Sequence, residues 1–239
     1  MASPAVGPWG NEPSWRNNRR LSCSLGASTP CDFREPERSM ALPTAGMTFD
    51  RPTGYVMPLI RAGMIEAERD GRPRGEAPEI AVLTDCYRQF DYEGLQRLVM
   101  DVACTAAKAT TMLAEMSPLN QVEILQEFSA QHTVEMAFDK TFKSGDVVWG
   151  YIPAMLRPIF QPETRPHPAE VLFEIDEKYG FSTSMDFIIA LAYYTGAIIH
   201  RMAKSTGRSA EDTALLLESR AKAAWAELDT YDKRPYMNR

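Results

Sequence analysis

From residue 79 onward, apolar side chains recur every three or four positions, the spacing that places them on one face of an α-helix. The clearest stripe consists of Leu95, Leu98, Val99, Val102, Ala106, Ala109, Leu113 and Met116. No alternation of strands with helices accompanies it, which makes a doubly wound α/β fold unlikely. The pattern therefore predicts an all-α fold.

The same spacing predicts where the helices lie. They are expected over residues 80–90, 92–116, 119–136, 168–179, 185–204 and 210–228, a bundle of about six helices, although residues 80–83 are also compatible with a strand. The expected N-caps are Asp91, Ser117, Ser184 and Ser209, since a short polar side chain before a helix can bond its free N–H groups. Gly180 and Gly207 are expected to end helices.

Residues 1–79 differ in composition from the rest of the chain. This segment holds ten of the 17 prolines and ten arginines, whereas no lysine occurs before Lys108. Proline-rich sequence cannot sustain helical or sheet hydrogen bonds. We therefore expect four regions. Residues 1–50 are a disordered Pro/Arg-rich arm, 51–78 a linker with room for a short helix over about 57–69, 79–231 a helical domain and 232–239 a polar tail. Translation could start at Met1, Met40 or Met47.

The helical pattern is interrupted over residues 139–166, where glycines and prolines are frequent. We expect a long connection here, and long loops inside compact domains are often functional. Trp149, Tyr151 and Met155 make this segment the candidate surface for contact with a partner. The competing interpretation is a crossover whose aromatic side chains fill the core.

Charge, hydropathy and cysteine usage exclude several classes of protein. A net charge of -6 and a pI near 5.2 give phosphate no broad attraction, so a nucleic-acid partner is not expected. The most apolar run, residues 187–199, is shorter than the roughly 20 residues that a membrane span needs. The four cysteines form no CxxC pair and no export signal is evident, so we expect a cytoplasmic protein with reduced thiols.

Catalytic motifs are missing from the sequence. It contains no GxSxG elbow, no phosphate-binding P-loop and no GxGxxG turn, so an enzyme is the less favoured class and no cofactor is expected. One metal alternative stays open, because His132 precedes Glu135 and His167 precedes Glu170 by one helical turn. The order is the reverse of the Glu-x-x-His pairs in ferritin-like di-metal sites.

A second alternative is a degenerate helix-turn-helix over residues 199–216. Ala203 and Gly207 have the required spacing, but Glu211 and Asp212 open the second helix. The first residues of a recognition helix meet bases and phosphates, which repel carboxylates. An ordinary helical hairpin is the simpler interpretation.

The leading hypothesis is a non-enzymatic helical protein that binds another protein, or itself, in an adaptor, regulatory or structural role. Thirteen methionines support it, because their side chains adapt to varied partners. The 19 arginines against seven lysines are typical of a GC-rich genome, as in actinobacteria and their phages.

Overall fold

The computed structural model describes residues 46–66, 78–137, 145–161 and 168–232, and every structural statement below concerns these residues. They form one short 3₁₀ helix and seven α-helices without a strand, which confirms the predicted all-α bundle. Most of the predicted N-terminal arm and polar tail lies outside the described residues. The elements are η2 (Pro52–Tyr55), α1 (Val56–Glu66), α2 (Pro78–Ala114), α3 (Gln121–Ala137), α4 (Gly145–Phe160), α5 (Pro168–Tyr179), α6 (Phe181–Thr206) and α7 (Ala210–Asp232).

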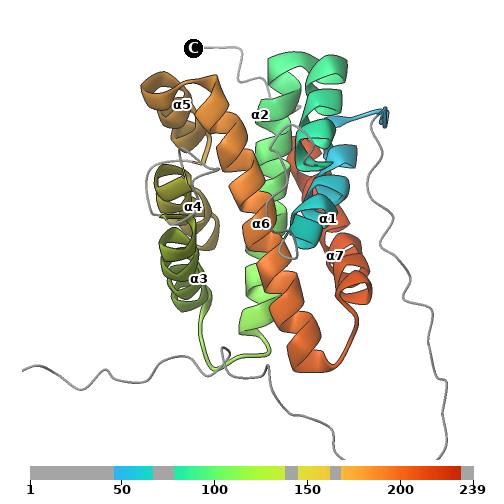
Figure 1. Cartoon of the computed structure of the whole chain (residues 1–239). Helices are drawn as coiled ribbons and strands as arrows, with labels where there is room; N and C mark the ends of the chain where they lie inside the picture. The colour runs from blue at the N-terminus through green and yellow to red at the C-terminus, as the bar shows by residue number, and fades with distance from the viewer. Residues whose placement is uncertain (1–45, 67–77, 138–144, 162–167, 233–239) are drawn as a thin grey trace, which may run out of the picture. The chain divides into compact units, whose positions relative to one another are not determined.

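Helix α6 is the central element of the bundle. It packs against α1, α2, α4, α5 and α7, while α3 packs mainly against α4 and α2 and meets α6 through Phe128, whose ring lies 5.9 Å from that of Tyr194 (Figure 1). Length and composition alone would allow α6 to cross a membrane, but 78% of its most apolar window is buried among the other helices. A helix that is apolar on nearly every side is typical of a bundle centre, as predicted for residues 187–199.

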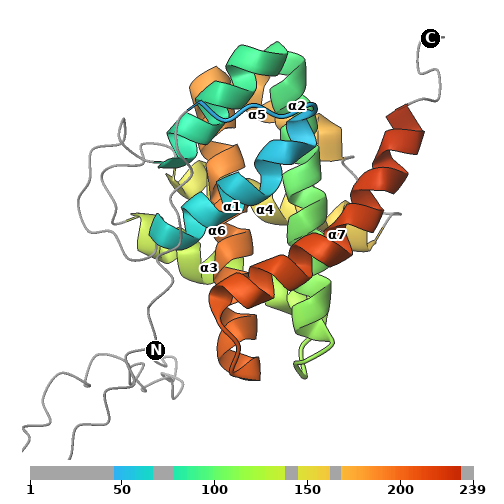
Figure 2. The ribbon, with the colours of Figure 1, turned by 90° about the vertical axis from the view of Figure 1, so that its right-hand side faces the viewer.

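Helix α1 is part of the core. The sequence placed residues 51–78 in a linker, yet Tyr55, Leu59, Ile60 and Met64 are fully or almost fully buried. The helix crosses in front of α6 (Figure 2), and the two backbones approach closely where they meet. A Cβ atom on Gly63 would lie 2.7 Å from Cδ1 of Tyr193. The helical core therefore begins well before residue 79.

The close approach of α1 and α6 predicts the effect of a larger side chain. We expect Gly63→Val to lower the free energy of unfolding by about 1–3 kcal/mol, because overpacking forces neighbouring side chains from their rotamers. Urea denaturation measures the change. The control is Gly150→Ala in α4, where a Cβ meets nothing within 4 Å. That variant should be neutral or slightly more stable, and equal destabilisation by both would contradict the close packing.

Helix boundaries follow the predicted capping residues only in part. Ser209 caps α7, since its Oγ accepts a hydrogen bond from the Asp212 N–H at 3.0 Å. Ser117 does not cap α3: Asn120 does so, with its Oδ1 accepting from the N–H groups of Val122 and Glu123 at 3.0 Å. The prediction that Ser184 is an N-cap was also wrong, because α6 already begins directly after Gly180, whose φ is +85°.

The predicted fold differs most from the structure at helix α4. Residues 139–166 were expected to be an irregular connection, but residues 145–160 form an α-helix that contains Pro153 and Pro158. Its buried side chains are Val148, Trp149, Ile152, Met155 and Leu156. They occupy one face, and burying that face outweighs the hydrogen bonds lost at the two prolines. The remainder of 139–166, except Gln161, lies outside the described residues.

Candidate functional site

The residues predicted to contact a partner are mostly core residues. Trp149 is 1% exposed and Met155 is fully buried, so neither can touch a partner while α4 stays packed. Tyr151 is half-buried and its hydroxyl donates a hydrogen bond to Glu174 Oε1 at 2.7 Å. The prediction of a contact surface at Trp149 and Met155 was wrong, and the competing interpretation, aromatic filling of the core, describes Trp149.

The predicted metal ligands are only partly within the described structure. His132 and Glu135 belong to α3, but their side chains lie outside the described residues, as does all of His167. Glu170 is exposed in the first turn of α5. Where side chains are described, no three His, Cys, Asp or Glu residues are grouped in a way that could hold a metal ion.

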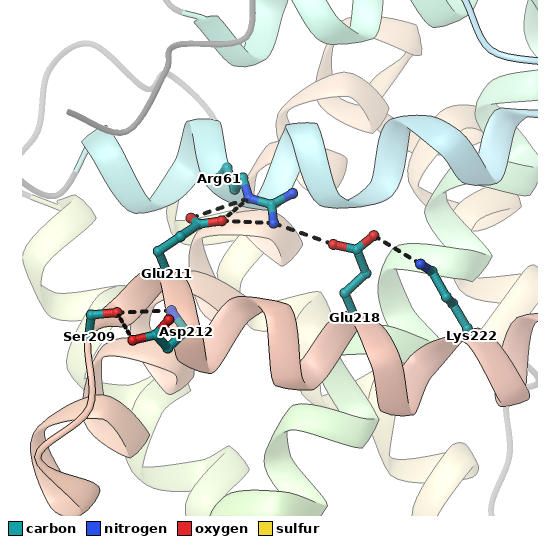
Figure 3. Close-up of polar contacts among 6 residues, drawn as sticks. All are labelled: Arg61, Ser209, Glu211, Asp212, Glu218 and Lys222. Carbon is teal, nitrogen blue, oxygen red and sulfur yellow. Dashed lines mark hydrogen bonds and ion pairs between the residues drawn. The ribbon is translucent and has the colours of Figure 1, made fainter. Parts of the chain in front are cut away.

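The predicted helix-turn-helix segment forms a hairpin whose second helix is fixed to α1. Gly207 ends α6 in a left-handed conformation, and α7 follows its Ser209 cap. Arg61 of α1 binds Glu211 and Glu218 of α7, with its Nη2 2.9 Å and 3.3 Å from their carboxylate oxygens (Figure 3). Lys222 extends the network to Glu218 at 3.4 Å. One of the two carboxylates that open α7 is thus used to hold the helix in place.

This network predicts a salt-dependent contribution to stability. The Arg61 side chain is 23% exposed and bridges two carboxylates, so we expect Arg61→Met to cost about 1 kcal/mol. High salt should reduce that cost, because ions screen partly exposed charges. Thermal unfolding of both proteins at low and high NaCl measures it. A loss that is the same at both salt concentrations would mean that packing, rather than charge, dominates at Arg61.

Three methionines help to line a groove formed by residues of α2, α6 and α7. The end of α2, the end of α6 and the start of α7 lie together at the bottom of Figure 1. The lining of the groove includes Met112, Met116, Met202 and Leu216, and its volume is about 220 Å³. Met112 and Met202 are buried at its base, whereas five of the nine lining residues are exposed: Glu115, Met116, Thr206, Arg208 and Arg220. The volume is below the roughly 300 Å³ at which small-molecule sites begin. The groove is therefore a weak candidate for a binding site.

The opposite end of the bundle carries a cluster of exposed aromatic side chains. We call Tyr87, Tyr92, Tyr179 and Phe181 the aromatic corner. Tyr87, Tyr179 and Phe181 are 44%, 40% and 44% exposed. The Phe181 ring lies 5.9 Å from the ring of Tyr87 and 6.1 Å from that of Tyr92. Single exposed apolar residues are common on protein surfaces, whereas a contiguous cluster is typical of a binding surface.

Two residues with unusual backbone angles lie next to the side chains of the aromatic corner. Asp91 interrupts α2 with φ 55° and ψ −157°, just before Tyr92, and it confirms the predicted break between helices at that residue. Gly180 alone separates α5 from α6, with φ +85°, between Tyr179 and Phe181. A non-glycine residue at such angles costs on the order of 1–3 kcal/mol and persists where its surroundings impose it. Such positions concentrate at binding sites.

Hydrogen bonds fix the rim of the aromatic corner. The Tyr92 hydroxyl donates to Asp176 Oδ2 at 3.1 Å, and the Tyr151 ring lies 6.3 Å from that of Tyr179. Burial and the hydrogen bond to Asp176 raise the pKa of Tyr92. The hydrogen bond to Glu174 is the main cause of the raised pKa of Tyr151. Both phenols therefore stay protonated at physiological pH and donate these hydrogen bonds.

The two described cysteines have inactive thiols. Burial raises the pKa of Cys86 to about 12 and that of Cys104 to about 11. Only the thiolate is a good nucleophile, so neither group is activated at neutral pH. Cys86 is buried and Cys104 is half-buried, and both belong to α2.

Comparison with protein-family models, with curated proteins and with solved structures found no match to this chain.

The aromatic corner was missed in the sequence because its members come from three helices. The run Tyr179-Gly180-Phe181 is the one local signal, since two aromatic residues on either side of a helix-ending glycine must flank a sharp turn.

Proposed function

We propose that the chain is a non-enzymatic helical protein that binds a segment of another protein, in an adaptor or regulatory role, and that the aromatic corner is its contact surface. The observation that supports this most strongly is the exposure of two large aromatic side chains, Tyr87 and Phe181, whose rings lie 5.9 Å apart. Tyrosine and other aromatic residues are enriched at protein interfaces, where a few of them provide most of the binding free energy. We place this activity in the cytoplasm, where free thiols such as Cys86 stay reduced.

The shape of the surface also supports binding by contact. The rings of Tyr87 and Tyr92 are tilted against that of Phe181 by 54° and 49°, so they do not cover one another. Tyr87 and Phe181 are each 44% exposed in the unbound protein, and covering their apolar area is favourable by about 25 cal/mol per Å². The left-handed Gly180 and the strained Asp91 hold the rings in place before binding, which lowers the entropic cost of association.

The experiment is a capture assay with the tagged full-length chain in extract of its source cells. The wild-type protein is compared with the double variant Tyr87→Ala/Phe181→Ala and with Phe173→Ala. Phe173 is the matched control, because it is 58% exposed on α5 but has no ring contact with the corner among the described residues. We expect the wild-type protein and the control to retain a polypeptide that the double variant loses.

Two results would contradict the proposal. The first is recovery of the same polypeptides by all three proteins, when circular dichroism shows that the double variant is folded. The second is a wild-type dimer in light scattering that becomes a monomer in the double variant. In that case the corner covers a second copy of the chain instead of a different protein.

A further inference from the structure

We infer that the partner segment that binds the aromatic corner is rich in arginine. This inference rests on the proposed function and adds the chemistry of the partner. Three features of the corner support it: the charges around it, a cation over one of its rings, and the spacing of those rings.

The charged groups around the corner are mainly carboxylates. Asp91 and Glu93, both exposed, stand on either side of Tyr92 in the sequence. Asp176 and Glu174 accept the hydroxyl hydrogen bonds of Tyr92 and Tyr151. The cations nearest to these rings in the sequence are Arg88 and Lys178, so carboxylates are in excess. The complementary partner is positively charged.

One ring of the corner already carries a cation. Lys178 Nζ lies 5.1 Å from the centroid of the Tyr179 ring, within the roughly 6 Å range of a cation–π contact. Tyr87 and Phe181 present similar electron-rich rings, and in the described residues no cation is placed over either of them. The corner therefore has free positions for further cations.

Arginine fits these positions better than lysine. Its planar guanidinium stacks on an aromatic face and can also bind a carboxylate through two parallel N–H groups, whereas an ammonium is a compact and strongly hydrated charge. The centroid of the Phe181 ring lies 5.9 Å from that of Tyr87 and 6.1 Å from that of Tyr92. Alternate residues of an extended chain are about 6.6 Å apart, so two arginines separated by one residue can reach neighbouring rings.

The test uses a fluorescein-labelled peptide with arginine at alternate positions and serine between them. A second peptide has lysine in place of every arginine, and fluorescence anisotropy with the full-length chain gives both dissociation constants. We expect the lysine peptide to bind at least about threefold more weakly than the arginine peptide. The double variant Tyr87→Ala/Phe181→Ala should weaken binding of the arginine peptide by about tenfold, and Phe173→Ala should not change it.

Three outcomes would overturn the inference. They are no binding of the arginine peptide at low salt, equal affinity for the two peptides, and equal affinity of the wild-type chain and the double variant. Equal affinity for the peptides would mean that charge alone attracts them. None of these results affects the capture assay, which reports on the surface whatever its partner is made of. The two proposals therefore fail separately.

Discussion

Asp101→Ala is expected to lower the free energy of unfolding by about 3–5 kcal/mol, because it removes one partner of a buried ion pair. Asp101 is fully buried and accepts hydrogen bonds from Arg97 Nε at 3.1 Å and from the Thr53 hydroxyl at 2.6 Å. Its loss takes one carboxylate away from the guanidinium of Arg97, which is only 18% exposed. The hydrogen bond that joins η2 to α2 is lost as well. Urea denaturation followed by circular dichroism measures the difference.

Two further variants test the cause of this loss. Arg97→Met/Asp101→Leu removes both charges, and we expect it to be less destabilised than Asp101→Ala because no buried charge is left unpaired. Arg88→Ala breaks a 3.9 Å pair with Asp85 in which Arg88 is 75% exposed, and it should cost less than about 1 kcal/mol. If Asp101→Ala were no more destabilising than Arg88→Ala, Asp101 would not join η2 to α2 as described.

Trp149→Ala should have an effect of similar size for a different reason. Trp149 is among the largest fully buried side chains, and replacing a buried tryptophan by alanine costs about 3–5 kcal/mol because the cavity collapses only in part. The control in the same helix is Tyr151→Phe, which removes only the hydroxyl bonded to Glu174 and should cost about 1 kcal/mol or less. A mild effect of Trp149→Ala would mean that α4 is not firmly packed and that Trp149 is available to a partner.

The spacing of apolar residues was enough to predict most of the helices. The stripe from Leu95 to Met116 and the apolar run 187–199 correspond to α2 and to the central helix α6. Helix α4 was missed because Pro153 and Pro158 weigh against a helix locally. Burial of its apolar face, which decides the outcome, depends on residues far away in the sequence. Helix α1 was placed near its observed position, but its burial against α6 could not be read from its own residues.

The candidate site was beyond the sequence for a related reason. Exposure depends on the whole fold, so Trp149 was predicted to be a contact residue and is core. Tyr87 fits the apolar face of its predicted helix by spacing and is nevertheless exposed, as is Phe181. The sequence also does not predict the positive φ of Asp91, because a single aspartate before a helix is usually an N-cap with an extended backbone. The sequence did predict the two points, at Asp91 and Gly180, where the helices end and the corner forms.

The most direct test of the central claim is photo-crosslinking at the corner in the cells of origin. A benzophenone amino acid replaces Tyr87 in one protein and Phe173 in the other, and both are irradiated in intact cells. We expect a discrete, heavier adduct with a second protein from position 87 and none from position 173. Absence of an adduct at position 87, or the same adduct from both positions, would contradict the claim that the aromatic corner is a protein-binding surface.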